Sequence, residues 1–210
     1  MRRKLFAALA ITLLLIVCGC GGGGSSPPVF FTTQILSSHA NDGDIELDSG
    51  GVFHVSQGGL ASVFAGLDSV TGSEFRAFLD FRLTGAGGVP GSAFIDSATL
   101  DIFIDSYQST APSIPVRIEL VSFPPQTLLP SDYDRVVQPP LAAIRTFIIP
   151  GDVNHNVQID VTPLMVQAQR LALPDFQVRI LEDLGPVTPG LFEIEEATAS
   201  RAPLLQVIYH

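Results

Sequence analysis

Short stretches in which apolar and polar residues alternate recur along this chain, and they constrain its fold more than any other feature. Residues 75–83 place an apolar side chain at every second position, and residues 98–105 repeat the pattern. Alternation of this kind gives a strand one apolar face, which an antiparallel sheet buries. Further strands are expected at 116–121, 176–181 and 204–209, separated by clusters of Pro, Gly, Asp and Ser.

One segment, residues 163–173, has a helical pattern instead, with Pro163 at a first-turn position and few β-branched residues. A turn at 151–156 leads into the strand before it, and Asp160 or Thr162 is expected to cap the helix. Many short strands with one short helix, and no strand–helix–strand rhythm, predict an all-β fold. We expect an antiparallel, jelly-roll-like β-sandwich.

The start of the chain predicts export. Arg2, Arg3 and Lys4 precede an apolar run over residues 5–17, which is too short to span a bilayer as a stable helix. The sequence Val-Cys-Gly-Cys follows and resembles the bacterial lipobox, in which the cysteine receives diacylglycerol. Cys20 fits this role better than Cys18, because the preceding residue must be small and Gly19 is. An ordinary signal peptide or a lone transmembrane anchor are the alternatives.

The expected organisation is a signal peptide at 1–19, a lipidated cysteine and tether at 20–40, and a sandwich domain at 41–210. Residues 21–28 read Gly-Gly-Gly-Gly-Ser-Ser-Pro-Pro, a composition typical of flexible tethers. The residue after Cys20 is glycine and not the aspartate of an inner-membrane retention signal. We therefore expect a lipid-anchored protein of the cell envelope, at the outer membrane or the cell surface.

Composition narrows the partners and the chemistry of the exported domain. Beyond Lys4 the chain has eight arginines, no lysine and 21 acidic residues, which is a net charge of −13. Nucleic acids and anionic lipid headgroups require clustered positive charge, so neither is an expected partner. With Cys18 removed and Cys20 lipidated, no cysteine is left for a disulfide, a thiolate metal site or a nucleophile.

Four segments together resemble a known family. They are Arg-Ala-Phe-Leu-Asp-Phe at 76–81, Ile-Asp-Ser-Ala-Thr-Leu-Asp-Ile at 95–102, Ile-Asp-Val-Thr-Pro-Leu-Met-Val-Gln at 159–167, and Phe-Glu-Ile-Glu-Glu-Ala with Arg-Ala-Pro-Leu-Leu-Gln-Val-Ile-Tyr within 192–209. Their order and spacing resemble the DNRLRE domain, a jelly-roll-like module of bacterial and archaeal surface proteins, whose relatives include carbohydrate-binding modules. The resemblance implies a non-catalytic module that binds polysaccharide or a cell-envelope glycan.

The chain departs from that family at two places. The tryptophans common before the third segment are absent, and Ile194 or Glu195 stands where the family has a serine. The last segment also suggests an ion pair of Arg201 with Glu195 or Glu196.

Sugar recognition usually depends on flat aromatic rings and on polar groups that bind hydroxyls. The chain has no tryptophan and three tyrosines. Tyr209 lies on the terminal strand and is expected to be structural. Tyr107 and Tyr133 lie in or beside loops, and Tyr133 is followed closely by Arg135. These three, Tyr133, Tyr107 and Arg135, are the candidate ligand-binding residues.

An acidic stretch before residue 50 is the candidate cation site. Asp44, Glu46 and Asp48 are spaced two apart, so on one strand their carboxylates would share a face. Calcium binds several such oxygens, which makes a structural calcium ion one interpretation. The alternative is a solvated edge strand, which charges protect from aggregation.

No catalytic pattern is present in the sequence. None of the four histidines stands in a nucleophile–base arrangement, and the common hydrolase, zinc-protease and nucleotide-binding motifs are absent. A pair of acids brought together by folding needs no local motif, so a glycosidase remains the third alternative. We predict a binding module rather than an enzyme, with a structural, adhesion or protein-docking role as the runner-up.

The lipobox reading yields a direct test. Replacing Cys20 by serine removes the acceptor sulfur, and the protein is expected to leave the membrane fraction or to be mislocalised. Cys18→Ser changes a residue that cleavage discards, so it should leave the protein membrane-bound. Fractionation of cells expressing each variant, followed by immunoblotting, separates these outcomes.

Overall fold

The structure is a computed structural model, and it describes residues 27–183 and 188–210. The predicted signal peptide, Cys18, Cys20 and the first part of the predicted tether lie outside the described residues. Among the helices that are described, none is both long enough and apolar enough to cross a membrane.

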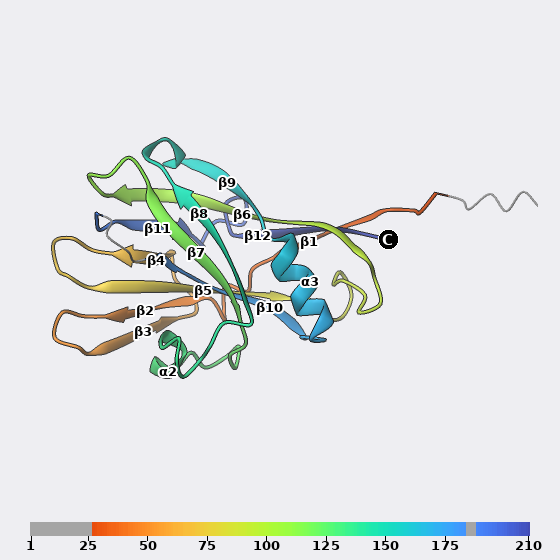
Figure 1. The fold of residues 1–210 in the computed structure, drawn as a ribbon, viewed down its shortest axis with the longest axis horizontal. Coiled ribbons are helices and arrows are strands. Elements are labelled where there is room, and N and C mark those ends of the chain that lie inside the picture. Colours follow the sequence, from red (N-terminus) through yellow and green to blue (C-terminus); the bar gives the residue numbers. More distant parts are fainter. Residues whose placement is uncertain (1–26, 184–187) are drawn as a thin grey trace, which may run out of the picture.

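Antiparallel strands dominate the described part of the chain, as the alternating patterns predict (Figure 1). The strands are β1 (Phe31–Leu36), β2 (Gly43–Leu47), β3 (Phe53–Gln57), β4 (Ser62–Leu67), β5 (Glu74–Arg82), β6 (Ile95–Gln108), β7 (Ile114–Val121), β8 (Ala142–Ile148), β9 (His155–Asp160), β10 (Asp175–Glu182), β11 (Leu191–Glu195) and β12 (Leu204–Tyr209). The helical elements are α2 (Pro130–Tyr133), the 3-10 turn η1 (Pro150–Asp152) and α3 (Thr162–Arg170).

The strands form two layers that are joined into one curled sheet. The first layer, the front sheet, has the order β3-β2-β5-β10-β7-β8. In the second layer, the back sheet, the long strand β6 pairs with β9 along one edge and with β12 and β11 along the other; β1 and β4 lie outside these two. A short pairing of β4 with β5 connects the layers. This is the predicted all-β sandwich.

The main core lies between the two sheets and is built from the alternating positions. Ala77, Leu79 and Phe81 of β5 point into it, as do Leu100 and Ile104 of β6, all with no exposed surface. Fully burying one such large side chain contributes about 1.5–3 kcal/mol. The inward faces predicted for these two strands are therefore confirmed.

Helix α3 contributes Leu164, Met165 and Ala168 to the same core. Its position agrees with the predicted helix, and it packs at one end of the sandwich against β6 and β8 (Figure 1). The Asp160 carboxylate accepts the Thr162 amide N–H at 2.9 Å at the start of the helix.

The domain begins earlier than the sequence analysis placed it. Residues 31–36 fall in the range assigned to the tether, yet they form β1 and pair with β12 along their whole length. Its sequence, Phe-Thr-Thr-Gln-Ile-Leu, lacks the alternation of apolar and polar residues seen in β5 and β6. Only Ile35 of this strand is buried. Pairing with β12 organises β1, and sequence periodicity alone does not reveal such a strand.

A segment of residues 122–141, here called the covering segment, connects β7 to β8 and folds over the outer face of the front sheet. It carries five prolines, which disfavour a strand or a long helix. Phe123, Leu128 and Tyr133 of this segment pack on Ile45 and Phe78 of the sheet and form a second, smaller core. The front sheet is thus buried on both faces over part of its area.

Candidate functional site

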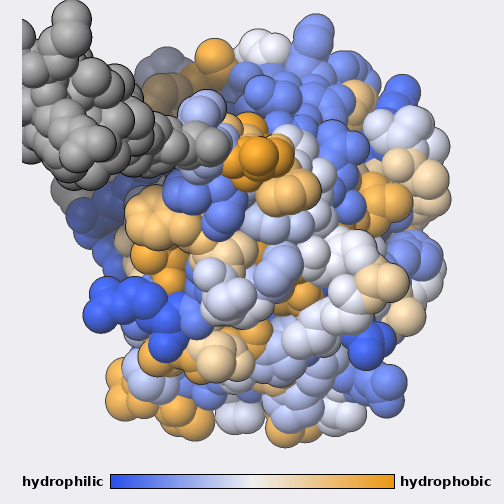
Figure 2. All heavy atoms as spheres, turned by 90° about the vertical axis from the view of Figure 1, so that its right-hand side faces the viewer, coloured by the Kyte–Doolittle hydropathy of each residue, from blue (hydrophilic) through white to orange (hydrophobic). Residues whose placement is uncertain are grey.

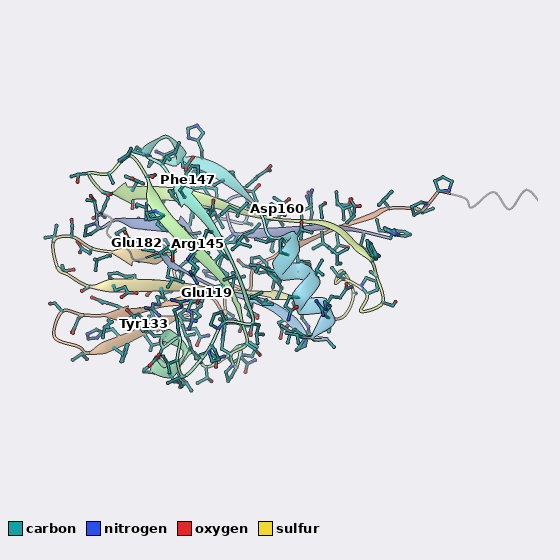
Figure 3. All side chains as sticks on the ribbon, viewed as in Figure 1. Glu119, Tyr133, Arg145, Phe147, Asp160 and Glu182 are labelled. Atoms are coloured by element: carbon teal, nitrogen blue, oxygen red, sulfur yellow. The ribbon has the colours of Figure 1, made fainter. Side chains whose placement is uncertain are left out.

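Arginines gather on the outer face of the front sheet. Five of the eight arginines after Lys4 lie there, and each forms an ion pair: Arg76 on β5, Arg117 on β7, Arg135 in the covering segment, Arg145 on β8 and Arg179 on β10. Alternation along each strand explains the position, because the neighbouring residues of β5, β7 and β10 point into the main core. This set of side chains is here called the arginine face, and Figure 3 labels Glu119, Arg145 and Phe147 on or beside it.

The centre of the arginine face is an ion pair with no exposed surface. Arg179 donates from Nε and Nη2 to Glu119 Oε2, at 3.0 and 2.7 Å. Its remaining hydrogen bonds go to the covering segment, with Nη1 donating to the Asp132 carbonyl at 2.5 Å and Nη2 to the Gln138 carbonyl at 3.1 Å. One buried guanidinium therefore attaches the covering segment to the sheet.

Glu119 also forms ion pairs with two more exposed arginines. Its Oε1 lies 2.8 Å from Arg135 Nε and 3.8 Å from Arg117 Nη1. Three arginines thus surround one buried carboxylate. Arg135 is the most exposed of the three, with 39% of its side chain accessible to solvent. Burial lowers the pKa of Arg179, and the hydrogen bonds to Glu119 oppose that shift.

Tyr133, in the covering segment beside Arg76, is buried and is not presented to solvent. The Arg76 guanidinium carbon is 3.7 Å from the centroid of the Tyr133 ring, and Phe53 packs edge-on at 5.2 Å. A hollow of about 320 Å³ is lined by Leu47, Phe53, Arg76, Tyr133, Asp134 and Arg135. Burial raises the pKa of the Tyr133 hydroxyl above its usual value.

The other end of the arginine face is open. Arg145 and Phe147 project from β8 with 69% of the Arg145 side chain and 62% of Phe147 exposed. Arg117 is the cross-strand neighbour of Arg145. Asp183 binds both arginines, accepting from Arg117 Nε at 3.1 Å and from Arg145 Nε at 2.6 Å. A second hollow, about 420 Å³, is lined by Arg117, Ala143, Ile144 and Arg145.

The structure brings together two of the three ligand-binding candidates. Tyr133 and Arg135 line the same hollow, whereas Tyr107 lies at the end of β6 in the back sheet. The Tyr107 hydroxyl donates to the Ala111 carbonyl at 2.8 Å, and its ring packs against the main core. Neither tyrosine presents a fully open ring face.

The three acidic candidates for calcium are separated in the fold. Strand β2 ends at Leu47, so Asp48 lies in the following turn and does not share a strand face with Asp44 and Glu46. Asp44 is buried and accepts the Phe64 amide N–H at 3.1 Å. Asp48 is occupied by the amides of Gly50 and Val52 and by His54.

These contacts have opposite effects on the two aspartates. Burial raises the pKa of Asp44 to about 6, whereas the hydrogen bonds from Val52 and His54 lower the pKa of Asp48. Within residues 27–183 and 188–210, no group of three or more Asp, Glu, His or Cys side chains is arranged to hold a metal ion. The three residues therefore do not form one ligand set here, and calcium binding stays a prediction.

A buried pair of carboxyl groups connects the two sheets. Asp42 and Glu196 are both nearly inaccessible, and Asp42 Oδ2 and Glu196 Oε1 have no hydrogen-bond partner among the described residues. Asp42 Oδ1 accepts the Asp80 amide N–H at 2.7 Å, and Ser37 Oγ lies 3.5 Å from Glu196 Oε2. Burial raises the pKa of Asp42 to about 7 and that of Glu196 to about 10. Arg201 instead pairs with Glu195, at 3.1 Å, which resolves the alternative left open by the sequence.

Arg145 and Phe147 are not among the ligand-binding residues that the sequence predicts. Phe147 looks like a core residue in a chain with many phenylalanines, and β8 has only a weak alternation. The available signal was the sequence Ala-Ala-Ile-Arg-Thr-Phe-Ile at 142–148, in which Arg145 and Phe147 are two apart and so share one face of a strand.

Comparison of the chain with protein-family models and with curated proteins found no match. The resemblance to the DNRLRE domain therefore rests on the four sequence segments alone.

The ion pair at the centre of the arginine face can be tested by stability. Glu119→Gln removes the charge that neutralises Arg179 inside the protein, and loss of one partner of a buried pair costs about 3–5 kcal/mol. Asp183→Asn is the matched control, because Asp183 pairs with the more exposed Arg117 and Arg145, where an ion pair contributes about 1 kcal/mol or less. Urea denaturation measures both. Equal, small losses for the two variants would contradict this role of Glu119.

The buried carboxyl pair predicts a pH-dependent stability. Because folding raises the pKa of Asp42 from 3.8 to about 7, the stabilising protonated form is fully present below pH 4 and is lost as the pH rises toward 7. Asp42→Asn keeps the acceptor for the Asp80 amide and adds a donor toward Glu196.

We expect this variant to be more stable than the wild type above pH 7, by on the order of 1–3 kcal/mol, since it relieves an unsatisfied buried carboxylate. It should also flatten the pH profile. Asp96→Asn, at an exposed position, serves as the control in thermal melts from pH 4 to 8. An unchanged slope in Asp42→Asn would be inconsistent with a proton shared by the pair.

Proposed function

We propose that this chain is a non-catalytic lipoprotein of the cell envelope, whose sandwich domain binds polysaccharide or a cell-envelope glycan. The lipid anchor rests on the lipobox-like sequence that ends in Cys20. Binding rests on one observation above the others, the exposed Phe147 ring beside Arg145 on strand β8.

This pair has the two elements that sugar recognition needs. An exposed phenylalanine ring can pack against the apolar face of a pyranose, while the hydroxyl groups around the sugar require polar partners. Arg145 uses its Nε for Asp183, and its side chain is 69% exposed and lines the second hollow.

The remaining arginine face supports the same site. Arg117 lines one hollow and Arg135 lines the other. Both arginines approach the same buried carboxylate, that of Glu119. A fixed guanidinium loses less conformational freedom on binding than a mobile one. The ion pairs therefore favour a preorganised binding surface.

A protein-docking role is the second candidate, and it is favoured by the position of β8. Strand β8 ends the order of the front sheet, and Leu141, Phe147 and Ile149 expose apolar surface along it. An edge strand of this kind can pair with an extended segment of another protein. A structural or adhesion role would use the same edge.

Glycan binding can be measured by retention of the purified protein on immobilised polygalacturonate, dextran and isolated peptidoglycan, with calcium present. We expect retention on at least one of these, and Phe147→Ala should weaken it about tenfold, which corresponds to about 1.4 kcal/mol for a lost stacking contact.

Phe94→Ala is the matched control, because Phe94 is equally exposed but lies on a different part of the domain, at the start of β6. It should retain wild-type binding. No retention on any glycan, together with capture of a stable protein partner, would favour the docking role instead. Breakdown of a glycan that depends on a pair of acids would contradict a non-catalytic module.

A further inference from the structure

One end of the domain carries a cluster of exposed aromatic side chains. Phe31 stacks on Tyr209 with ring centroids 5.8 Å apart. The His210 ring contacts Phe30 at 5.2 Å and Phe94 at 5.0 Å. These five residues, here called the terminal aromatic cluster, come from both termini of the described chain and from the segment before β6.

Backbone pairing fixes the position of the cluster. Phe31 is the register partner of Tyr209 in the β1–β12 pairing. Phe94 and His210 exchange two backbone hydrogen bonds, of 2.8 and 3.0 Å. Phe31 and Tyr209 are therefore held by strand pairing, and Phe94 and His210 by backbone hydrogen bonds at the ends of β6 and β12.

Four of the five members of the cluster are open to solvent, and Tyr209 is partly buried against the main core. Between 52% and 66% of Phe30, Phe31 and Phe94 is exposed, and the adjacent Val29 is exposed as well. The rings form two groups at the same end of the domain, Phe31 with Tyr209 and His210 with Phe30 and Phe94. Single exposed phenylalanines are ordinary, but several gathered at one end make that end a candidate for interaction. Figure 1 places the C-terminus and the start of β1 at the same end of the molecule, and Figure 2, which faces that end, shows hydrophobic patches among polar atoms.

The distance along the chain to Cys20 indicates what covers this surface. Phe30 follows Cys20 by ten residues, which span at most about 36 Å when fully extended. A lipid on Cys20 therefore keeps the terminal aromatic cluster within a short distance of the bilayer surface.

We propose that the terminal aromatic cluster is a membrane contact, which inserts at the boundary between headgroups and acyl chains beside the lipid on Cys20. The proposal rests on the lipid anchor proposed above. Tyrosine and tryptophan are enriched at this depth of the bilayer, and interfacial segments bury phenylalanine there. The domain carries a net charge of −13, so zwitterionic lipid is the preferred surface and anionic lipid the poorer one.

This contact would orient the domain as well as strengthen the anchor. The two acyl chains of diacylglycerol already anchor a protein stably, and a second contact with the bilayer restricts its orientation. Arg145 and Phe147 lie over the strands of the front sheet and away from the end where the chain terminates (Figure 3). Insertion of the terminal aromatic cluster therefore leaves the proposed glycan face clear of the bilayer.

The absence of tryptophan from the sequence gives a clean reporter. Phe94→Trp places a single indole in the terminal aromatic cluster, and Phe147→Trp places one on the front sheet as the matched control. Each variant is purified with its lipid and reconstituted into phosphatidylcholine vesicles. We expect the emission of Phe94→Trp to move to shorter wavelength and to be quenched by lipids labelled with nitroxide near the headgroup. The emission of Phe147→Trp should change in neither respect.

The outcomes separate the two proposals. Mass spectrometry of the mature N-terminal peptide reports the lipid on Cys20; its absence would overturn the anchor, and with it the membrane contact. A lipidated, vesicle-bound protein whose Phe94→Trp emission stays solvent-like overturns the contact alone. A blue shift that appears without vesicles and grows with protein concentration also overturns it, because it assigns the surface to a second copy of the chain.

Discussion

The buried ion pair between Arg179 and Glu119 is the interaction on which the front sheet depends. Two charges placed without solvent exposure are stable only when their hydrogen bonds are satisfied, and here the covering segment supplies the remaining acceptors. Arg179 on β10, held by Glu119 on β7, thus determines where the covering segment lies on the sheet. The covering segment in turn buries Ile45 and Phe78 on β2 and β5, whereas Arg145 and Phe147 on β8 stay open to solvent.

Period-two alternation was sufficient to predict the sandwich, because the residues that carry it are those that fill the core. Strands β5, β6, β7, β10 and β12 were all predicted within a few residues. Strand β1 was missed and assigned to the tether, since only Ile35 is buried and its pairing with β12 joins residues far apart in the sequence. Charged residues at inward or outward positions look alike in a sequence, so the partners of Glu119 were not predictable either.

The candidate site was predictable only in part, for the same reason. Tyr133 and Arg135 share a hollow as their spacing suggested, but the Arg76 guanidinium covers the Tyr133 ring from a strand more than fifty residues away. The acidic residues Asp44, Glu46 and Asp48 were expected on one face, yet the strand ends before the third. In both cases the deciding contact is long-range or lies at a strand end, where local pattern carries little information.

The proposed ligand-binding surface is the outer face of β7 and β8. The most direct measurement is an NMR titration of isotope-labelled protein with oligosaccharides from the glycan that retains it best. Chemical-shift changes are predicted for the amides of Arg117, Arg145 and Phe147, with those of Phe94 and Tyr209 unchanged. Changes confined to the back sheet or to the terminal aromatic cluster would contradict the claim.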